Sequence, residues 1–468
     1  MQLMIIREEN KVCSWPYRSL EKGCYMKRRA FLKGVACSVS AVAGGTAAFG
    51  QGAPSNQVRV ALMGCHSKGR GFQLMKAFTG LPNVAIATVC DVDARAMDEA
   101  AAEIQTRTQK APKKEKDLRK VLEDKEIDGV ICAAPDHWHA PAALLTMKAG
   151  KAIYVEKPCC HNPREGEILV AAAAKTGAVF QMGNQRRSSA VYQNVIKEIR
   201  GGIIGEPRFA RCWYATQRDP IGKGKQAAVP EWLDWDLWQG PAPRRAFQDN
   251  VVPYKWHWFH HWGTGECGNN ATHYVDVARW ALNVTFPSRI TSAGGRLFHE
   301  GDDWEWFDTQ AATFEFPDRK FMTWEGLSSV KGRPYESAST GTMVYGLNGS
   351  VLFTPDNVCT LFDKAGKKVR EWTSKEVTGD ATNRTNPTMG LDGAHLGNWA
   401  ACIRNKDAQT PSPAAEAYAS TLLTHLANIA QRTGETVRVD PATGRLAKGS
   451  AGSELWAREY EKGWEMGV

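Results

Sequence analysis

One stretch decides the fold: Val58-Arg59-Val60-Ala61-Leu62-Met63, followed directly by Gly64-Cys65-His66-Ser67-Lys68-Gly69-Arg70-Gly71. The apolar run predicts a buried strand, and the glycines after it predict a tight turn. A helical pattern continues beyond the turn, and a second apolar run, Val84 to Cys90, ends in Asp91. This order of strand, glycine loop, helix, strand and acid is typical of a dinucleotide-binding site.

Each part of this loop has a predicted role in binding a nucleotide. The helix after the glycines offers free N–H groups and a positive dipole end to a pyrophosphate. Asp91 would bond ribose hydroxyls and repel a 2′-phosphate, which favours NAD over NADP. His66 stands where the standard pattern has its second glycine, so a plain tight turn stays the alternative for the loop by itself. The predicted cofactor contacts here are Gly64, His66, Gly69, Arg70 and Asp91.

Strand and helix patterns continue to alternate through the next hundred residues. Apolar runs at 127–132, 152–155 and 178–182 are separated by helical patterns, for example at 141–149. Repeated strand–helix units imply a doubly wound parallel sheet, the Rossmann arrangement. We therefore expect a dinucleotide-binding domain over 56–186 and a second domain over 187–468.

One of these strands ends in an unusual group of residues, Ala152-Ile153-Tyr154-Val155-Glu156-Lys157-Pro158. Open α/β sheets bind their ligands at the carboxyl ends of the strands. Lys157 is therefore predicted to lie where a cofactor and a substrate meet. A surface lysine that pairs with Glu156 is the alternative.

Three pieces of the chain together resemble one protein family. They are the segment from Gly64 to Asp91, the Pro135-Asp136-His137-Trp138-His139 turn, and Glu156-Lys157-Pro158. They are similar to the glucose–fructose oxidoreductase/inositol dehydrogenase (Gfo/Idh/MocA) family. The resemblance covers nearly all of residues 56–465 and includes the segment Gln181-Met182-Gly183-Asn184-Gln185-Arg186-Arg187.

The resemblance implies that Lys157 lies beside a nicotinamide and the reacting hydroxyl of a sugar. A lysine near a cationic ring and walls of low dielectric has a lowered pKa, which suits it to proton transfer. Further cofactor contacts are expected from Pro135, His139 and Glu156. For His139 a purely structural role is the alternative.

A second chemical centre is expected around residue 270. A helical pattern from about Asn270 to Leu282 would place Asn269 and His273 on one face. The resemblance implies an Asp…His pair here, in which His273 acts as acid/base; a helix-packing histidine is the alternative. Asn269 replaces the expected aspartate and cannot raise the basicity of His273 by charge. We therefore expect Lys157 to carry more of the proton chemistry.

Many of the 17 tryptophans lie in two aromatic segments, 230–241 and 256–262. Flat aromatic faces can stack on sugars while polar groups bind the hydroxyls, although most single tryptophans in such segments belong to a core. We predict that Trp258 and His261 line the substrate pocket. The histidines lack a carboxylate at helical spacing, so we expect no metal. The full set of predicted substrate contacts is Asn184, Arg186, Trp258, His261, Asn269, His273 and His395.

The carboxy-terminal half has the pattern of an open sheet. Apolar and polar residues alternate in runs such as 309–316, and Asn348-Gly349 is a hairpin signal. These patterns predict an α+β domain with a mostly antiparallel sheet. The resemblance implies that this sheet forms a homo-oligomer, either a dimer or a tetramer.

The first 52 residues are predicted to be an export signal. Lys27-Arg28-Arg29-Ala30-Phe31-Leu32-Lys33 precedes a short apolar run, which resembles a twin-arginine signal with Met26 as the true start. The run is too short to span a bilayer, so we expect a periplasmic protein without a stable membrane anchor. The net charge of +9 falls to +4 beyond residue 50 and is dispersed, which argues against a nucleic-acid partner.

These observations lead to one expected function and two alternatives. The first is an exported, NAD-dependent oxidoreductase that acts on a ring hydroxyl of a sugar or glycoside, with a tightly bound cofactor recycled in the site. The first alternative is a redox-neutral glycosidase that oxidises its substrate transiently at C3. The second is a sugar-binding protein without catalysis.

Overall fold

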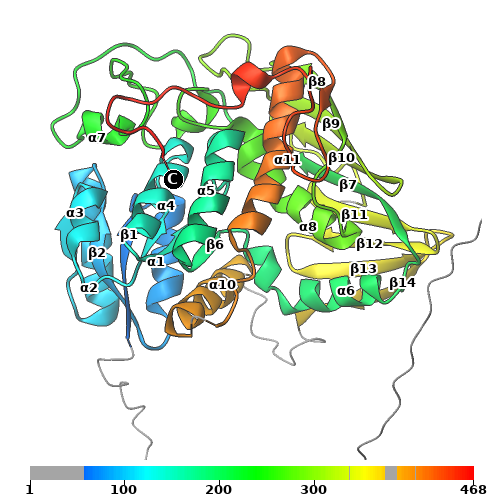
Figure 1. Ribbon diagram of the computed structural model, residues 1–468, viewed down its shortest axis with the longest axis horizontal. Coiled ribbons are helices and arrows are strands. Elements are labelled where there is room, and N and C mark those ends of the chain that lie inside the picture. Colours follow the sequence, from blue (N-terminus) through cyan, green and yellow to red (C-terminus); the bar gives the residue numbers. More distant parts are fainter. Residues whose placement is uncertain (1–56, 337, 375–386, 406, 468) are drawn as a thin grey trace, which may run out of the picture. The chain divides into compact units, whose positions relative to one another are not determined.

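The computed structural model describes residues 57–467 except 337, 375–386 and 406. Its amino-terminal part is a six-stranded parallel sheet with the strand order β3-β2-β1-β4-β5-β6, flanked by helices (Figure 1). This confirms the predicted Rossmann sheet. Its elements are β1 (Val58–Met63), α1 (Arg70–Thr79), β2 (Val84–Cys90), α2 (Ala94–Thr108), β3 (Lys113–Glu115), α3 (Leu118–Glu123), β4 (Gly129–Cys132), α4 (Asp136–Lys148), β5 (Ala152–Val155), α5 (Pro163–Thr176) and β6 (Phe180–Met182).

The inner strands of the parallel sheet are apolar and buried on both faces, whereas the edge strand β3, Lys113–Glu115, is polar and mostly exposed. On one face, Leu74 and Phe78 of α1 pack with Leu396 and Trp399 of α10 (Pro387–Arg404). The other face is covered by α3, α4 and α5. The chain therefore returns, more than 200 residues later, to cover the nucleotide-binding domain, which the division at residue 186 did not anticipate.

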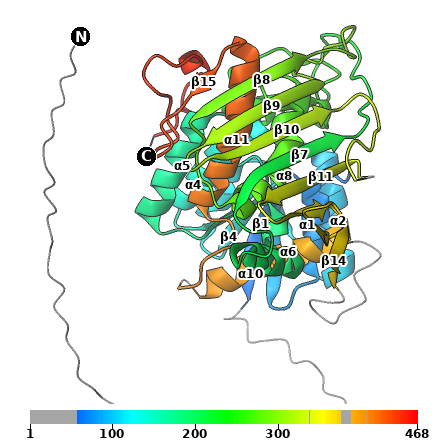
Figure 2. The ribbon, with the colours of Figure 1, turned by 90° about the vertical axis from the view of Figure 1, so that its right-hand side faces the viewer.

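The second sheet has nine strands in the order β14-β13-β12-β11-β7-β10-β9-β8-β15. All its pairs are antiparallel except β7 with β10, which confirms a mostly antiparallel sheet. Figure 2 shows these strands in front of α8 (Thr272–Leu282) and α11 (Ala414–Thr433). The strands are β7 (Pro207–Ala215), β8 (Arg289–Gly295), β9 (Thr309–Phe316), β10 (Lys320–Leu327), β11 (Thr340–Gly346), β12 (Gly349–Thr354), β13 (Val358–Asp363), β14 (Lys368–Trp372) and β15 (Val437–Arg438).

A buried ion pair joins the two parts of the fold. Arg187, in the 3₁₀ turn η2 (Gln185–Ser188), contacts Asp276 of α8 at 2.8 Å. Asn184 donates to the same carboxylate at 3.0 Å. The Arg187 charge helps to hold the pKa of the buried Asp276 below its usual range, against the effect of burial itself. Because a charge left unpaired here would be costly, this network fixes the end of β6 on α8.

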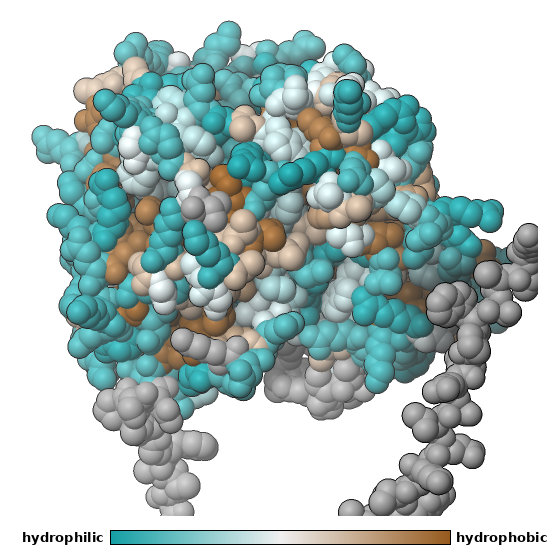
Figure 3. Space-filling model, in the orientation of Figure 1, coloured by the Kyte–Doolittle hydropathy of each residue, from teal (hydrophilic) through white to brown (hydrophobic). Residues whose placement is uncertain are grey.

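Some predictions fall outside what the structure describes. The export signal over residues 1–52 lies outside the described residues, and the homo-oligomer stays a prediction. On the face drawn in Figure 3, hydrophobic residues form small separate patches among hydrophilic ones.

None of the described helices combines the length and apolar character needed to cross a membrane.

Candidate active site

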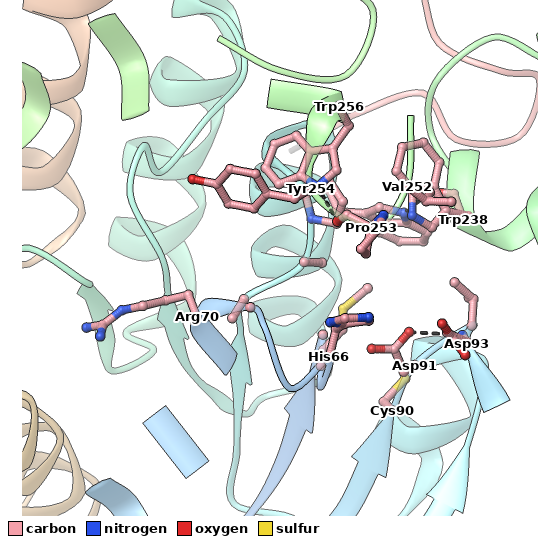
Figure 4. A pocket seen from close by; sticks show the side chains of 18 of the residues that line it. His66, Arg70, Cys90, Asp91, Asp93, Trp238, Val252, Pro253, Tyr254 and Trp256 are labelled. Carbon is pink, nitrogen blue, oxygen red and sulfur yellow. Dashed lines mark hydrogen bonds between the residues drawn. The ribbon is translucent and has the colours of Figure 1, made fainter. Parts of the chain in front are cut away.

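A cavity of about 380 Å³ lies at the carboxyl ends of β1, β2, β4 and β5. Its floor is the glycine loop and the ends of these strands, and its roof comes from residues 232–257. Figure 4 shows His66 and Asp91 on one side and Trp238, Val252 and Tyr254 on the other. Of the predicted site residues, the cavity is lined by Gly64, His66, Gly69, Arg70, Asp91, Pro135, His139, Glu156, Lys157 and Asn269.

The glycine loop has the close contacts that only glycine permits. Gly64 has φ +85°, and a Cβ there would lie 2.6 Å from the main chain of Ala133. A Cβ on Gly71 would lie 1.8 Å from the Gly64 carbonyl oxygen. Helix α1 begins after Gly69 without a capping side chain, so its first N–H groups are available to an anion. This cradle fits the pyrophosphate of a dinucleotide.

His66 is accommodated although it replaces a glycine. Its Nδ1 accepts the Lys68 N–H at 3.1 Å, and its carbonyl accepts the Gly69 N–H at 2.7 Å. In the neutral ring Nε2 then carries the hydrogen and can donate it. The side chain therefore stabilises the turn and presents a donor to the cavity, which is compatible with bound phosphate.

Asp91 lies at the end of β2, on the wall of the cavity. Its carboxylate accepts the N–H of Cys65 at 2.6 Å and that of Asp93 at 3.0 Å. Burial raises the pKa of Asp91, and these two hydrogen bonds oppose that shift. The acid thus ties the glycine loop to the second strand, in the position from which a ribose would be bound.

Arg70 lines the cavity, as predicted for a cofactor contact, but its guanidinium is bound by carboxylates of the protein. The guanidinium donates to Glu156 at 3.1 Å and to both oxygens of Asp392, at 2.8 and 2.5 Å. Figure 4 shows it directed away from His66 and Asp91. Asp392 lies on α10, 322 residues along the chain. The side chain of Arg70 therefore joins three elements beneath the site.

The segment from Pro135 to His139 begins helix α4, whereas the sequence predicted a turn with the helix starting at Pro141. Pro135 is the N-cap residue, and Asp136 is the acid of the first turn. His139 is buried, with Nδ1 2.6 Å from the Pro158 carbonyl oxygen and Nε2 2.8 Å from that of Ala134. Its contacts favour the structural role that the sequence had left as the alternative.

Lys157 reaches the cavity from the end of β5. Its Nζ donates to the carbonyl oxygen of Asn269 at 2.7 Å and to Oδ1 of the same residue at 2.8 Å. Burial lowers the pKa of Lys157, although nearby carboxylates of Glu156 and Asp136 oppose the shift. A lysine with a lowered pKa beside a nucleotide cradle is suited to accept and return a proton.

The segment around Asn269 and His273 was predicted to be one helix from about Asn270, but in the structure it has two parts. Cys267–Ala271 forms a π-helical turn, and α8 begins only at Thr272. The wider turn directs Asn269 to Lys157, while His273 does not line the cavity described here. Burial lowers the pKa of His273, and the charge of Lys157 lowers it further. His273 is therefore neutral and near Lys157, and its acid/base role stays a prediction.

The aromatic segments form a lid whose members divide between core and cavity. Trp258 is 3% exposed, and its ring centroid lies 4.5 Å from that of Trp304. It does not line this cavity, and its role in substrate binding stays a prediction. His261 donates from Nε2 to the Pro243 carbonyl at 2.7 Å and also lies outside it. From residues 232–257, the aromatic side chains that line the cavity are Trp232, Trp238, Tyr254, Trp256 and His257, and Trp138 of α4 lies beside them in the lining.

His257 is a wall residue that the sequence analysis missed. Its ring stacks on Trp256 with centroids 3.6 Å apart. Nδ1 lies 2.7 Å from the Tyr254 carbonyl oxygen, which can only accept, so Nδ1 carries the hydrogen and Nε2 is an acceptor. Burial lowers the pKa of His257 to about 3. Two other histidines, His260 and His261, follow within four residues, and nothing in that pattern distinguishes His257.

Three further predicted substrate contacts, Asn184, Arg186 and His395, also lie outside the cavity and make contacts within the fold. Asn184 is bound to Asp276, and Arg186 donates to the His273 carbonyl at 3.2 Å. His395 is fully buried between the Met182 carbonyl, at 2.8 Å, and the Ser188 hydroxyl, at 2.6 Å. These contacts are structural, so a substrate role for the three residues stays a prediction.

The fold and the cavity define a nucleotide-binding α/β protein of the Rossmann class. A model described as "Oxidoreductase family, NAD-binding Rossmann fold" matches residues 58–184, and "Oxidoreductase family, C-terminal alpha/beta domain" matches 213–296. The chain belongs to the Gfo/Idh/MocA family, and its amino-terminal domain is that family's NAD-binding fold.

Curated relatives and solved structures agree with this assignment. A "Glycosyl hydrolase family 109 protein" of Saccharopolyspora erythraea is 29% identical over 206 residues, 41% of this chain and 44% of the relative. One of Shewanella pealeana is 31% identical over 153 residues, 32% of this chain and 33% of the relative. The matched segments thus span 44% and 33% of the length of these two relatives.

Similarity to solved structures extends over more of the chain. Levoglucosan dehydrogenase, in complex with NADH and levoglucosan, has a TM-score of 0.64 at 18% identity and covers 82% of this chain and 99% of its own. Aldose–aldose oxidoreductase from Caulobacter crescentus has a TM-score of 0.61 at 16% identity, with 82% and 100% covered. At these identities the similarity shows the fold alone.

Proposed function

We propose that the protein is an NAD-dependent oxidoreductase that removes a hydride from a ring hydroxyl carbon of a sugar or glycoside. The observation that carries the proposal is the position of Lys157 at the end of β5, on the wall of the cavity that contains the glycine cradle. Its Nζ is held by two oxygens of Asn269, at 2.7 and 2.8 Å. The family and the names of similar proteins, which include sugar dehydrogenases, support it.

The residues of the chain divide the work of binding and proton transfer. When bound in the cradle, NAD supplies a hydride acceptor. Lys157 takes the proton of the reacting hydroxyl and stabilises negative charge that grows on its oxygen. His257, which also lines the cavity, presents an acceptor nitrogen. Burial and the charge of Lys157 lower the pKa of His273 and disfavour its protonation, so Lys157 is the proposed proton acceptor.

The lid supports the proposal of a tightly held, recycled cofactor. Its main chain is bonded to the nucleotide domain: Ala94 donates to the Trp232 carbonyl, and Asp234 donates to that of Val92, both at 3.0 Å. Lys116 adds an ion pair to Asp234 at 2.8 Å. A roof attached in this way slows the release of whatever it covers.

A redox-neutral glycosidase is the second candidate, favoured by the printed name of the glycosyl hydrolase relatives. Oxidation at C3 of a glycoside acidifies the neighbouring C–H. Elimination can then release the aglycone, water adds, and the hydride is returned to C3. The same Lys157 would serve both the oxidation and the reduction.

One experiment separates these possibilities. Purified mature protein is incubated with a panel of glucosides and galactosides, the near-ultraviolet absorbance of reduced nicotinamide is followed, and products are identified by mass spectrometry. Keto-sugars with a change in absorbance support the oxidoreductase, and free aglycone without net reduction supports the glycosidase. A cofactor-free protein that binds sugars unchanged would contradict both and identify a non-catalytic binding protein.

We further propose that the protein is exported to the periplasm in folded form. The support is the paired arginines Arg28 and Arg29 before an apolar run in the sequence. Cell fractionation with a cytoplasmic marker enzyme is expected to recover the protein in the periplasm, and Arg28→Lys with Arg29→Lys is expected to retain it in the cytoplasm. A wild-type protein found only in the cytoplasm would contradict the proposal.

A further inference from the structure

Glu266 lies directly behind the residue that holds Lys157. Its side chain is buried, with the residue only 4% exposed, and both carboxylate oxygens accept hydrogen bonds. Oε1 accepts the Asn269 Nδ2 at 3.1 Å, and Oε2 accepts the Asn270 Nδ2 at 2.7 Å and the Arg218 Nε at 3.3 Å. Burying a carboxylate is costly, so these contacts indicate a specific role.

The Asn269 amide can face Lys157 in only one orientation. An ammonium only donates hydrogen bonds, and an ionised carboxylate only accepts them. With Glu266 on one side and Lys157 on the other, Nδ2 must face the carboxylate and Oδ1 must face the ammonium. Without Glu266, a flipped amide would direct N–H groups at Lys157.

We propose that Glu266 is the positioning residue for Lys157. It orients the Asn269 amide and supplies, one hydrogen bond beyond it, the negative charge that an asparagine lacks. Arg218, on the far side of Glu266, is the counter-ion of this relay. The inference rests on the proposed function for its meaning in catalysis, but the arrangement of the three side chains stands independently.

The charges around Lys157 set the direction of the test. Burial and the charge of Arg70 favour the neutral amine and lower its pKa, whereas Glu156, Asp136 and Glu266 favour the ammonium. Removing the charge of Glu266 should therefore lower the pKa of Lys157 further. Removing Arg218 should raise it, because Glu266 is then less compensated. Other titratable groups around Lys157 and Asn269 include His139, His257, His273 and Tyr254, whose hydroxyl interacts with Asn269.

Lys157 can be titrated without any turnover. In the wild-type sequence, trypsin cleaves after Lys151 and Arg164 but not between Lys157 and Pro158, so the peptide 152–164 carries Lys157 as its single lysine. The folded protein is treated briefly with a small anhydride at each pH of a series and is then digested. The acylated fraction of this peptide, measured by mass spectrometry, reports how much of Lys157 was a free amine. Glu266→Gln is expected to move the midpoint about one pH unit lower, and Arg218→Met is expected to move it higher.

Two further variants test the specificity of the effect. Asn270→Ala removes the other amide on Glu266 but does not touch Lys157, so its midpoint should match the wild type. Glu266→Gln with Asn269→Asp places a carboxylate directly on Lys157 and should move the midpoint back up. If Glu266→Gln alone does not fold, the double variant and Arg218→Met still test whether the charge of Glu266 sets the pKa of Lys157.

A midpoint that stays unchanged in folded Glu266→Gln, or that shifts upward, would overturn the proposal, as would equal midpoints in Arg218→Met and the wild type. A purely structural Glu266 would lower activity at every pH without moving the acidic limb of the pH profile. A midpoint shift in a protein that oxidises no sugar would refute the proposed function and leave this inference intact.

Discussion

Replacing Lys157 by alanine is expected to lower turnover by about 1,000-fold or more while nucleotide binding stays nearly unchanged. The lysine lies at the end of β5, and its Nζ makes two hydrogen bonds to Asn269. Burial lowers its pKa, and it lines the cavity at the end of a parallel strand, where the substrate is predicted to meet the cofactor. Steady-state kinetics and calorimetric titration with NAD measure the two quantities.

The design of this test includes a charge control and a surface control. Lys157→Arg keeps a cation but cannot act as a base, because a guanidinium does not deprotonate in proteins, so it should be as inactive as alanine. Lys175→Ala changes an exposed lysine of α5 and should leave turnover unchanged. Wild-type turnover in Lys157→Ala would remove Lys157 from the mechanism.

The second large effect is expected from Gly71→Ala, which should weaken NAD binding by about 100-fold. The new Cβ would lie 1.8 Å from the Gly64 carbonyl oxygen, and its other close neighbours include Ala133. Because the obstacle is main chain, the glycine loop must open and its N–H groups move away from the pyrophosphate. The loss should be visible as a smaller increase in melting temperature when NAD is added.

A second glycine on the same helix provides the matched control. Gly80 ends α1, and a Cβ there would meet its nearest atom at 3.5 Å, an ordinary contact. Gly80→Ala should therefore bind NAD as the wild type does. An unchanged dissociation constant in Gly71→Ala would show that the cradle is not the nucleotide site.

The fold was predictable where its signals are local. The apolar run from Val58 to Met63, the glycines after it and Asp91 identify the first strand–helix–strand unit, and the structure has these elements in the predicted parallel order. Asn348-Gly349 likewise marked the β11–β12 hairpin, which the structure forms. Periodicity and turn chemistry act over a few residues, so the chain itself specifies them.

The site was predictable only in part. The sequence placed Lys157 at a strand end, and the structure places it on the wall of the cavity. It did not distinguish His257, which lines the cavity, from Trp258 and His261, which do not. The segment forms a short 3₁₀ turn and loops, in which no regular period relates one side chain to the next.

Local patterns therefore specified the elements of this protein and the chemistry that each strand end carries. Contacts between distant segments decided which side chains reach the cavity. The lid takes its place because Leu233 pairs with Asp93, and Arg70 turns away because Asp392 receives it. Glu266 comes close to Lys157 because a π-helical turn places Asn269 between them. Such choices depend on buried hydrogen bonds and packing formed when the chain folds, and these have no short-range pattern to reveal them.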